Sequence, residues 1–89
     1  MNTNKYTCDT DANGNKSWYR DGKLHREDGP AIEWANGTKA WYRDGKFHRE
    51  DGPAVEYANG IKYWYLKGIE IKCKSNEEFL RLLKMKAFW

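Results

Sequence analysis

Apolar and polar residues alternate in short runs along most of this chain, and turn-forming pairs separate the runs. The runs are rich in Trp, Tyr, Ile and Val, side chains that favour β-strands. Asn-Gly and Asp-Gly pairs readily adopt the positive φ angles that two-residue type I′ turns require. The pattern therefore predicts a series of antiparallel β-hairpins. The turn pairs are Asn13-Gly14, Asp21-Gly22, Asn36-Gly37, Asp44-Gly45 and Asn59-Gly60, with Lys67-Gly68 in the corresponding place of the last unit.

The hairpins belong to an internal repeat. Residues 18–37 recur as residues 41–60, with an offset of 23 residues. The copies differ at three positions, each an exchange between apolar or aromatic residues: Leu24/Phe47, Ile32/Val55 and Trp34/Tyr57. A period of this size indicates stacked supersecondary units. We predict a mainly β fold, an antiparallel meander of 23-residue β-hairpin repeats forming one twisted sheet over 8–72, with two and a half repeats and a last strand.

The period changes from two to that of a helix near residue 75. Ser75-Asn-Glu-Glu78 is a capping-box sequence, and the apolar residues that follow share one arc of a helix. We predict an amphipathic α-helix over 75–87 that closes the sheet, docking near Trp64, Ile69 and Ile71. The whole chain, 1–89, is then a single domain.

Two-residue turns fix which side chains face each other. With Asn36-Gly37 at a tip, Trp34 lies opposite Lys39 and Ile32 opposite Trp41. Tyr57 then lies opposite Lys62, and Cys8 opposite Tyr19. Alternation sorts the residues into one ladder on each face. The first ladder holds Trp18, His25, Ile32, Trp41, His48, Val55, Trp64 and Ile71, edged by Lys16, Arg20, Lys39, Arg43 and Lys62. The second holds Tyr19, Leu24, Ala31, Tyr42, Phe47, Ala54 and Tyr65.

The segment Arg26-Glu-Asp-Gly-Pro-Ala31, with its twin at 49–54, leaves two arrangements open. A four-residue turn over 27–30 gives three strands per repeat and sets His25 opposite Ile32. A Gly-Pro kink in one long strand gives two strands per repeat. We favour the turn, because Pro cannot donate a hydrogen bond within a ladder and Asp-Gly-Pro is common in turns.

Charge is unevenly distributed. The net charge of +3 comes from the tail, because residues 16–60 are neutral and residues 61–89 carry seven bases against three acids. The basic character alone therefore does not indicate nucleic-acid binding.

The polar start, Met1-Asn-Thr-Asn-Lys5, resembles neither a signal peptide nor a membrane span. We therefore predict a cytoplasmic protein. In that compartment Cys8 and Cys73 are expected to be free thiols.

The His-Arg-Glu-Asp motif places an imidazole beside carboxylates, as a metal site or an acid/base pair would. Each copy supplies one His, whereas a zinc site needs several ligands, and the predicted register pairs no Ser or Cys with a His. We therefore predict no catalytic residue, metal or cofactor, and no enzymatic activity. Salt bridges across strands and His packed beside Trp explain the motif better.

The pattern Trp-Tyr-x-x-Gly-Lys-x-His-Arg-Glu-Asp-Gly-Pro-Ala, with Ala-Asn-Gly, resembles the repeats of small bacterial, phage and large-virus proteins loosely grouped with the MORN repeats. It covers residues 8–72. The resemblance implies a β-hairpin sheet with a binding or scaffolding role, and it suggests a phage-encoded inhibitor of a host defence protein acting in the host cytoplasm. The Tyr-x-Gly-x-Trp strand and Gly-x-Gly pair of MORN repeats are absent from the sequence, so the membrane association attributed to that family is not expected.

One small helix cannot cover both ladders, so aromatic surface should remain exposed for a partner. We predict binding of another protein. The alternative is nucleic-acid or nucleotide binding, because Lys and Arg alternate with Trp on one strand face and the tail is basic. A third hypothesis is a homodimer formed through edge strands. The predicted partner-binding residues are Trp18, Arg20, His25, Trp34, Lys39, Trp41, Arg43, His48, Tyr57 and Trp64.

Overall fold

The computed structural model describes residues 6–85, which form ten β-strands followed by one α-helix. The strands are β1 (Tyr6–Thr10), β2 (Lys16–Arg20), β3 (Lys23–Leu24), β4 (Ile32–Glu33), β5 (Lys39–Ala40), β6 (Tyr42–Arg43), β7 (Lys46–Phe47), β8 (Val55–Glu56), β9 (Lys62–Leu66) and β10 (Ile69–Ile71). The helix is α1 (Asn76–Lys84). Residues 1–5 and 86–89 lie outside the described residues. The last two positions of the predicted helix, 86 and 87, are among them.

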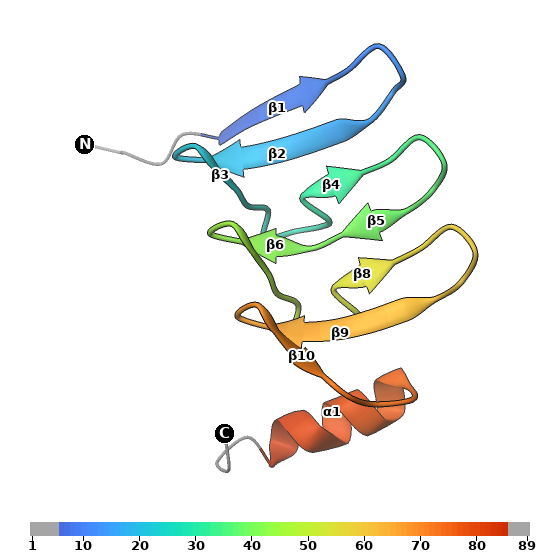
Figure 1. The fold of residues 1–89 in the computed structure, drawn as a ribbon. Helices are drawn as coiled ribbons and strands as arrows, with labels where there is room; N and C mark the ends of the chain where they lie inside the picture. Colours follow the sequence, from blue (N-terminus) through green and yellow to red (C-terminus); the bar gives the residue numbers. More distant parts are fainter. Residues whose placement is uncertain (1–5, 86–89) are drawn as a thin grey trace.

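The strands form an antiparallel meander that α1 closes at one end (Figure 1). The main sheet has the order β1-β2-β4-β5-β8-β9-β10, with β3 paired to β2, while β6 and β7 form a separate pair. The prediction of a mainly β hairpin meander closed by a C-terminal helix is confirmed. The described part is thin, 39 × 38 × 17 Å, so few side chains are fully buried. The buried apolar residues are Ala31, Ala40, Ala54, Val55, Trp64 and Phe79.

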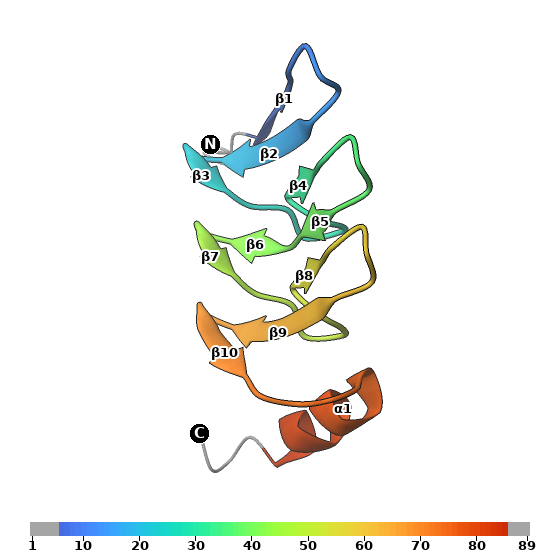
Figure 2. The same cartoon turned by 45° about the vertical axis from the view of Figure 1, so that its right-hand side comes forward.

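The Asp-Gly turns adopt the predicted geometry. Asp44 and Gly45 have φ angles of 51° and 82°, both positive as a type I′ turn requires. Tyr42 consequently pairs with Phe47 across this turn. The turns at Asp21-Gly22 and Lys67-Gly68 repeat these angles, so three equivalent hairpin tips stack along one edge of the molecule (Figure 2).

The Asn-Gly hairpins differ from the prediction by one residue. The Trp34 N–H donates to the Thr38 carbonyl at 2.9 Å, and the Gly37 N–H donates back to the Trp34 carbonyl at 3.0 Å. The loop therefore contains three residues, 35–37, with Gly37 alone at positive φ, 96°. This is the type I turn followed by a glycine bulge, the common three-residue alternative to a type I′ turn.

This shift corrects the predicted partners. Glu33, not Trp34, pairs with Lys39, and Ala40, not Trp41, pairs with Ile32. A one-residue slip moves a strand's side chains to the other face. Ile32 therefore leaves the first predicted ladder, the one with Trp18, Trp41 and Trp64, which we call the tryptophan ladder. The same correction applies to other predicted positions: Lys62 pairs with Glu56 rather than Tyr57, Val55 leaves the tryptophan ladder, and Cys8 pairs with Trp18 rather than Tyr19.

The preference for a four-residue turn at 27–30 is also wrong. The His25 N–H donates to the Trp18 carbonyl at 3.0 Å, and the Trp18 N–H donates to the Ala31 carbonyl at 2.7 Å. Segments 23–25 and 31–33 therefore line the same edge of β2, and residues 26–30 bulge out between them. Each repeat is a two-stranded hairpin whose second strand carries a loop, so successive repeats run in the same direction.

Helix α1 has Ser75 as its N-cap, as the capping box predicts, although Glu78 reaches back to the N–H of Lys74 and not to that of Ser75. The Ser75 Oγ accepts a hydrogen bond from the Glu78 N–H at 3.1 Å, and the Glu78 carboxylate accepts one from the Lys74 N–H at 2.7 Å. Phe79 is fully buried and lies 6.3 Å from the Trp64 ring, measured between centroids. The helix thus docks at Trp64, as predicted, whereas Ile69 remains 67% exposed.

Phe79→Ala should destabilise the protein by about 3–5 kcal/mol, because it removes a fully buried aromatic ring and leaves Trp64 uncovered. The free energy of unfolding in urea measures the effect. Leu80→Ala, at a position on the same helix that is 40% exposed, is the matched control and should cost much less. Equal losses for the two variants would contradict the docking of α1 through Phe79.

Candidate functional site

One face of the sheet is lined by aromatic rings from three successive hairpins. The rings of Tyr42, Phe47 and Tyr65 form a stack, with centroids 4.6 Å and 4.8 Å apart. Tyr57 and Tyr63 meet edge to face at 6.0 Å. Partial burial raises the pKa of Tyr42, so this phenol stays neutral. We call this surface the aromatic face and define it as Trp34, Tyr42, Phe47, Tyr57, Tyr63 and Tyr65.

The outer part of the aromatic face is open to solvent. Trp34 is 37% exposed, Tyr57 46% and Tyr63 40%. Trp34 and Tyr57 hold equivalent positions in the two repeats. They flank a shallow groove of about 310 Å³ that Phe47 also lines. Large exposed aromatic residues that gather on one surface mark an interaction site.

The opposite face, which we call the tryptophan face, carries the three equivalent tryptophans Trp18, Trp41 and Trp64, and groups of the same chain cover each of them. The Arg26 guanidinium lies 3.9 Å from the centre of the Trp18 ring, and the Arg49 guanidinium lies 3.7 Å from that of Trp41. Such cation–π contacts stabilise partly buried rings. The third ring is covered by helix α1, through Phe79 and through a hydrogen bond of 3.1 Å from Trp64 Nε1 to Asn76 Oδ1.

Each covering arginine is held by three acceptors of its own repeat. Arg49 donates to the Asp51 carboxylate at 2.8 Å, to the Pro53 carbonyl at 3.0 Å and to the Glu56 carboxylate at 3.0 Å. A Cβ at Gly52 would approach the guanidinium carbon to 2.9 Å, so any larger residue there would require the arginine to shift from this position. Arg26 repeats this arrangement with Asp28, Pro30 and Glu33. The Arg-Glu-Asp-Gly-Pro motif is therefore an arginine clamp on a tryptophan.

The histidines of the motif join one repeat to the next. His25 is 1% exposed, and its Nδ1 accepts the Asp44 backbone N–H at 2.9 Å. Because Nδ1 accepts, the ring proton lies on Nε2, which donates to the Glu27 carboxylate at 3.2 Å. His48 repeats both contacts, with the Lys67 N–H and with Glu50. Each imidazole thus holds the hairpin tip of the following repeat.

Lysines and glutamates alternate across the strands of the tryptophan face. In order across the sheet the paired residues are Lys16, Glu33, Lys39, Glu56 and Lys62. Opposite charges that face each other across strands are favourable. Lys39 therefore stands between two carboxylates, which reduces its value as a contact for phosphate.

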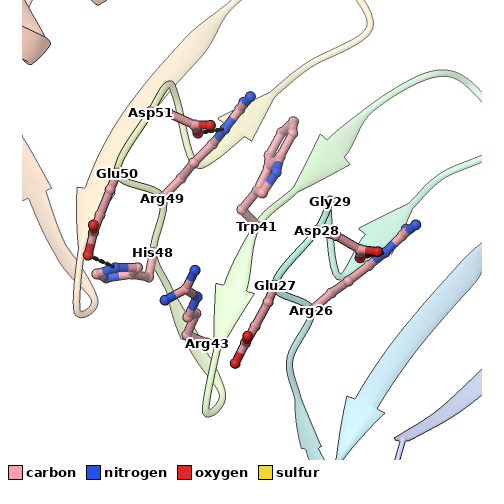
Figure 3. Close-up of a pocket in the computed structure, with 10 residues that line it drawn as sticks. All are labelled: Arg26, Glu27, Asp28, Gly29, Trp41, Arg43, His48, Arg49, Glu50 and Asp51. Atoms are coloured by element: carbon pink, nitrogen blue, oxygen red, sulfur yellow. Dashed lines mark hydrogen bonds and ion pairs between the residues drawn. The ribbon is translucent and has the colours of Figure 1, made fainter.

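A groove of about 590 Å³ runs between the two arginine-clamp loops on this face (Figure 3). Trp41 and Arg43 project into it from one strand, and the loops around Glu27 and Glu50 form its sides. The hydrogen bond from His25, together with the charges of Arg43 and Arg20, holds the pKa of Glu27 below its ordinary value. Glu27 therefore stays ionised at the side of this groove, near Arg43.

The predicted partner-binding residues divide into three groups. His25, His48 and Trp64 are buried and serve internal contacts. Trp18, Arg20, Lys39, Trp41 and Arg43 lie on the tryptophan face, and Trp34 and Tyr57 lie on the aromatic face. The predicted list omits Tyr42, Phe47, Tyr63 and Tyr65 of the aromatic face, although the second ladder predicted for the sheet already contained three of them. The missing signal was the register, which places Trp34 and Tyr57 beside those rings.

Within residues 6–85, no three His, Cys, Asp or Glu side chains gather as metal ligands. Cys8 and Cys73 are free thiols, and burial raises the pKa of Cys73. No helix in the described part of the chain is long and apolar enough to cross a membrane. The chain matches no protein-family model, no curated protein and no solved structure.

His25→Ala should destabilise the protein by about 1–3 kcal/mol, because it leaves the Asp44 N–H without its acceptor. His25→Asn should cost less, since an amide oxygen can replace Nδ1 as acceptor. Urea unfolding of both variants measures the difference. If Asn is as damaging as Ala, the hydrogen bond to the hairpin tip is not what His25 contributes.

Stability should also depend on the ionisation of Glu27. Its pKa is lowered in the folded protein from an ordinary value of 4.5, so its contribution is present above pH 4.5 and disappears as the pH falls through the lower, folded-state pKa. Glu27→Gln should therefore be less stable than the parent at neutral pH, and the gap should close in acid. Urea unfolding midpoints across this pH range measure the gap.

Asp9→Asn is the control for losing one negative charge, because Asp9 is exposed on β1 and forms no ion pair among residues 6–85. The difference in stability between Asp9→Asn and the parent protein should not close in acid as that of Glu27→Gln does. A gap for Glu27→Gln that stays constant from neutral pH into acid would show that its ionisation does not stabilise the fold.

Proposed function

We propose that this protein is a non-catalytic repeat module that binds another protein through the aromatic face. One observation carries the proposal: Trp34, Tyr57 and Tyr63 are exposed side by side with a stack of further rings, on the face opposite the arginine clamps. Tyr and Trp are the side chains most enriched among residues that dominate binding energy at protein interfaces.

The dimensions of the sheet are compatible with such an interface. A standard protein interface takes about 800 Å² from each partner, and the two long dimensions of the described part are 39 and 38 Å. Tyr57 packs edge to face against Tyr63, and Phe47 packs between Tyr42 and Tyr65, which restricts these rings before a partner binds and lowers the cost of ordering them. If the repeats belong to a phage protein, as their resemblance suggests, the partner we propose is a host protein, with inhibition of host defence as the function.

Nucleic-acid or nucleotide binding through the tryptophan face is the alternative, and its electrostatic support is weaker. Arg26 and Arg49 are bound within their own clamps, and Lys39 faces two glutamates. The rings of Trp18 and Trp41 already carry a guanidinium on one side, which leaves less of each ring for stacking with bases.

The double variant Trp34→Ser/Tyr57→Ser tests the proposal. A partner is first captured from the lysate of the native host, with and without nuclease, and is then purified for calorimetric titration. The dissociation constant should rise at least about 30-fold for the double variant, since the loss of even one of the two anchors typically costs about 2 kcal/mol at a protein interface.

Tyr6→Ser is the matched control, because Tyr6 is 52% exposed but lies on the edge strand β1, outside the aromatic face. It should leave binding unchanged. Unchanged affinity of the double variant, with its fold intact, would reject the aromatic face as the interface. A captured partner that is lost on nuclease treatment, or whose binding weakens steeply with salt, would favour the nucleic-acid alternative.

A further inference from the structure

Arg20 and Arg43 occupy the same place in successive hairpins, yet only Arg20 has ion-pair partners. Arg20 lies 3.3 Å from the Glu27 carboxylate and 3.2 Å from the Asp44 carboxylate. Its side chain is only 22% exposed. Arg43 is exposed and forms no ion pair with any of residues 6–85.

One part of the reason lies in the third hairpin tip, where Lys67 takes the position that Asp44 has in the second. The counterpart of Glu27, Glu50, is retained, but it pairs with His48 and not with Arg43. Asp44 and Lys67 both have a φ angle of 51°, and both donate their backbone N–H to a histidine Nδ1 at 2.9 Å. The backbone is therefore the same, and only the side chain differs. Exchange of Asp for Lys takes from Arg43 the carboxylate that binds Arg20 in the preceding unit.

Further cations surround the vacant position. Lys46 pairs with Arg43 across its own turn, and its side chain lies against Gly68, the neighbour of Lys67, where a Cβ would approach it to 3.6 Å. Arg43 lines the 590 Å³ groove between the clamp loops (Figure 3) and is exposed, so a ligand can reach it from solvent. Of these cations Arg43 alone lines the groove, while Lys46 and Lys67 belong to its own hairpin tip and to the next one.

We propose that Arg43, assisted by Lys67, binds the carboxylate of an acidic side chain of a protein partner, in the manner in which Asp44 binds Arg20. Arginine binds carboxylates through charge-assisted hydrogen bonds of fixed geometry. A phosphate group meets the same cations, but Glu27 and Glu50 line the groove and repel its greater charge. The Arg20 site shows that one aspartate is tolerated beside Glu27. This site is separate from the aromatic face and does not depend on it.

The Nε–Hε signals of Arg20 and Arg43 in the NMR spectrum of the ¹⁵N-labelled protein provide the test. They are assigned with Arg20→Lys and Arg43→Lys and followed during titration with a capped Gly-Asp-Gly peptide at constant ionic strength. We expect a saturable shift of the Arg43 signal, a much smaller shift for Arg20, and no saturable shift with capped Gly-Asn-Gly.

Two reciprocal variants make the test specific. Lys67→Asp should abolish the response of Arg43, because the new carboxylate occupies the site from within the chain. Asp44→Lys should create a response at Arg20. Asp is compatible with the backbone of position 67, since Asp44 adopts the same φ, and the backbone spectrum confirms that each variant is folded.

Several results would overturn the proposal. Equal shifts of the Arg43 and Arg20 signals in the parent protein would show that the peptide does not distinguish between the two arginines. An undiminished Arg43 shift in Lys67→Asp would show that the vacant position is not the site. A larger Arg43 shift with inorganic phosphate than with the aspartate peptide, at equal concentration, would assign the site to phosphate instead. None of these results bears on the aromatic face, whose test uses different residues.

Discussion

The stacking of an arginine on a tryptophan is the interaction on which the rest of this fold depends. A sheet with so few fully buried side chains has no second layer to cover its large rings, and the chain supplies the cover itself. Arg26 and Arg49 reach back over Trp18 and Trp41, and their acceptors fix the loops at 26–30 and 49–53. These loops give each repeat a local core that does not need a large apolar interior, which suits a chain of 89 residues.

The clamp also determines how the repeats connect. Because residues 26–30 leave the strand as a loop and return to the same edge of β2, each repeat keeps two strands and the next begins in the same orientation. His25 and His48 then hold the following hairpin tip through Nδ1. At the last repeat the motif is absent, and Phe79 of α1 covers Trp64 in place of an arginine. The helix therefore covers the last tryptophan as the two arginines cover the first two, and it ends the series of repeats.

The repeat period, the hairpins and the closing helix could be predicted from the sequence, because turn pairs and periodicity are local signals. The register could not. Asn36-Gly37 suits a two-residue turn and also the last two positions of a three-residue loop, and the choice depends on partners such as Thr38, whose hydroxyl accepts the Ala58 N–H at 3.1 Å. The arginine clamp was missed for a similar reason: Arg49, Trp41 and Glu56 come together only when the loop is closed. The site prediction followed the tryptophans, and the wrong register concealed that Trp34 and Tyr57 lie on the other face.

The two faces of the sheet differ in how far their side chains are covered by the chain itself. On the tryptophan face the charged side chains are largely engaged with each other, and the rings are covered, so most of its chemistry maintains the stack. The aromatic face has no such cover within the described residues. Of its outer rings, Trp34 and Tyr57 hold equivalent positions, whereas Tyr63 stands where the preceding repeat has Ala40. Exposed rings of this size weaken solubility, and the chain retains two of them at equivalent positions while it covers every tryptophan of the other face. A purely structural sheet has no need of this asymmetry, whereas a sheet that holds one face together and presents the other to a partner requires it.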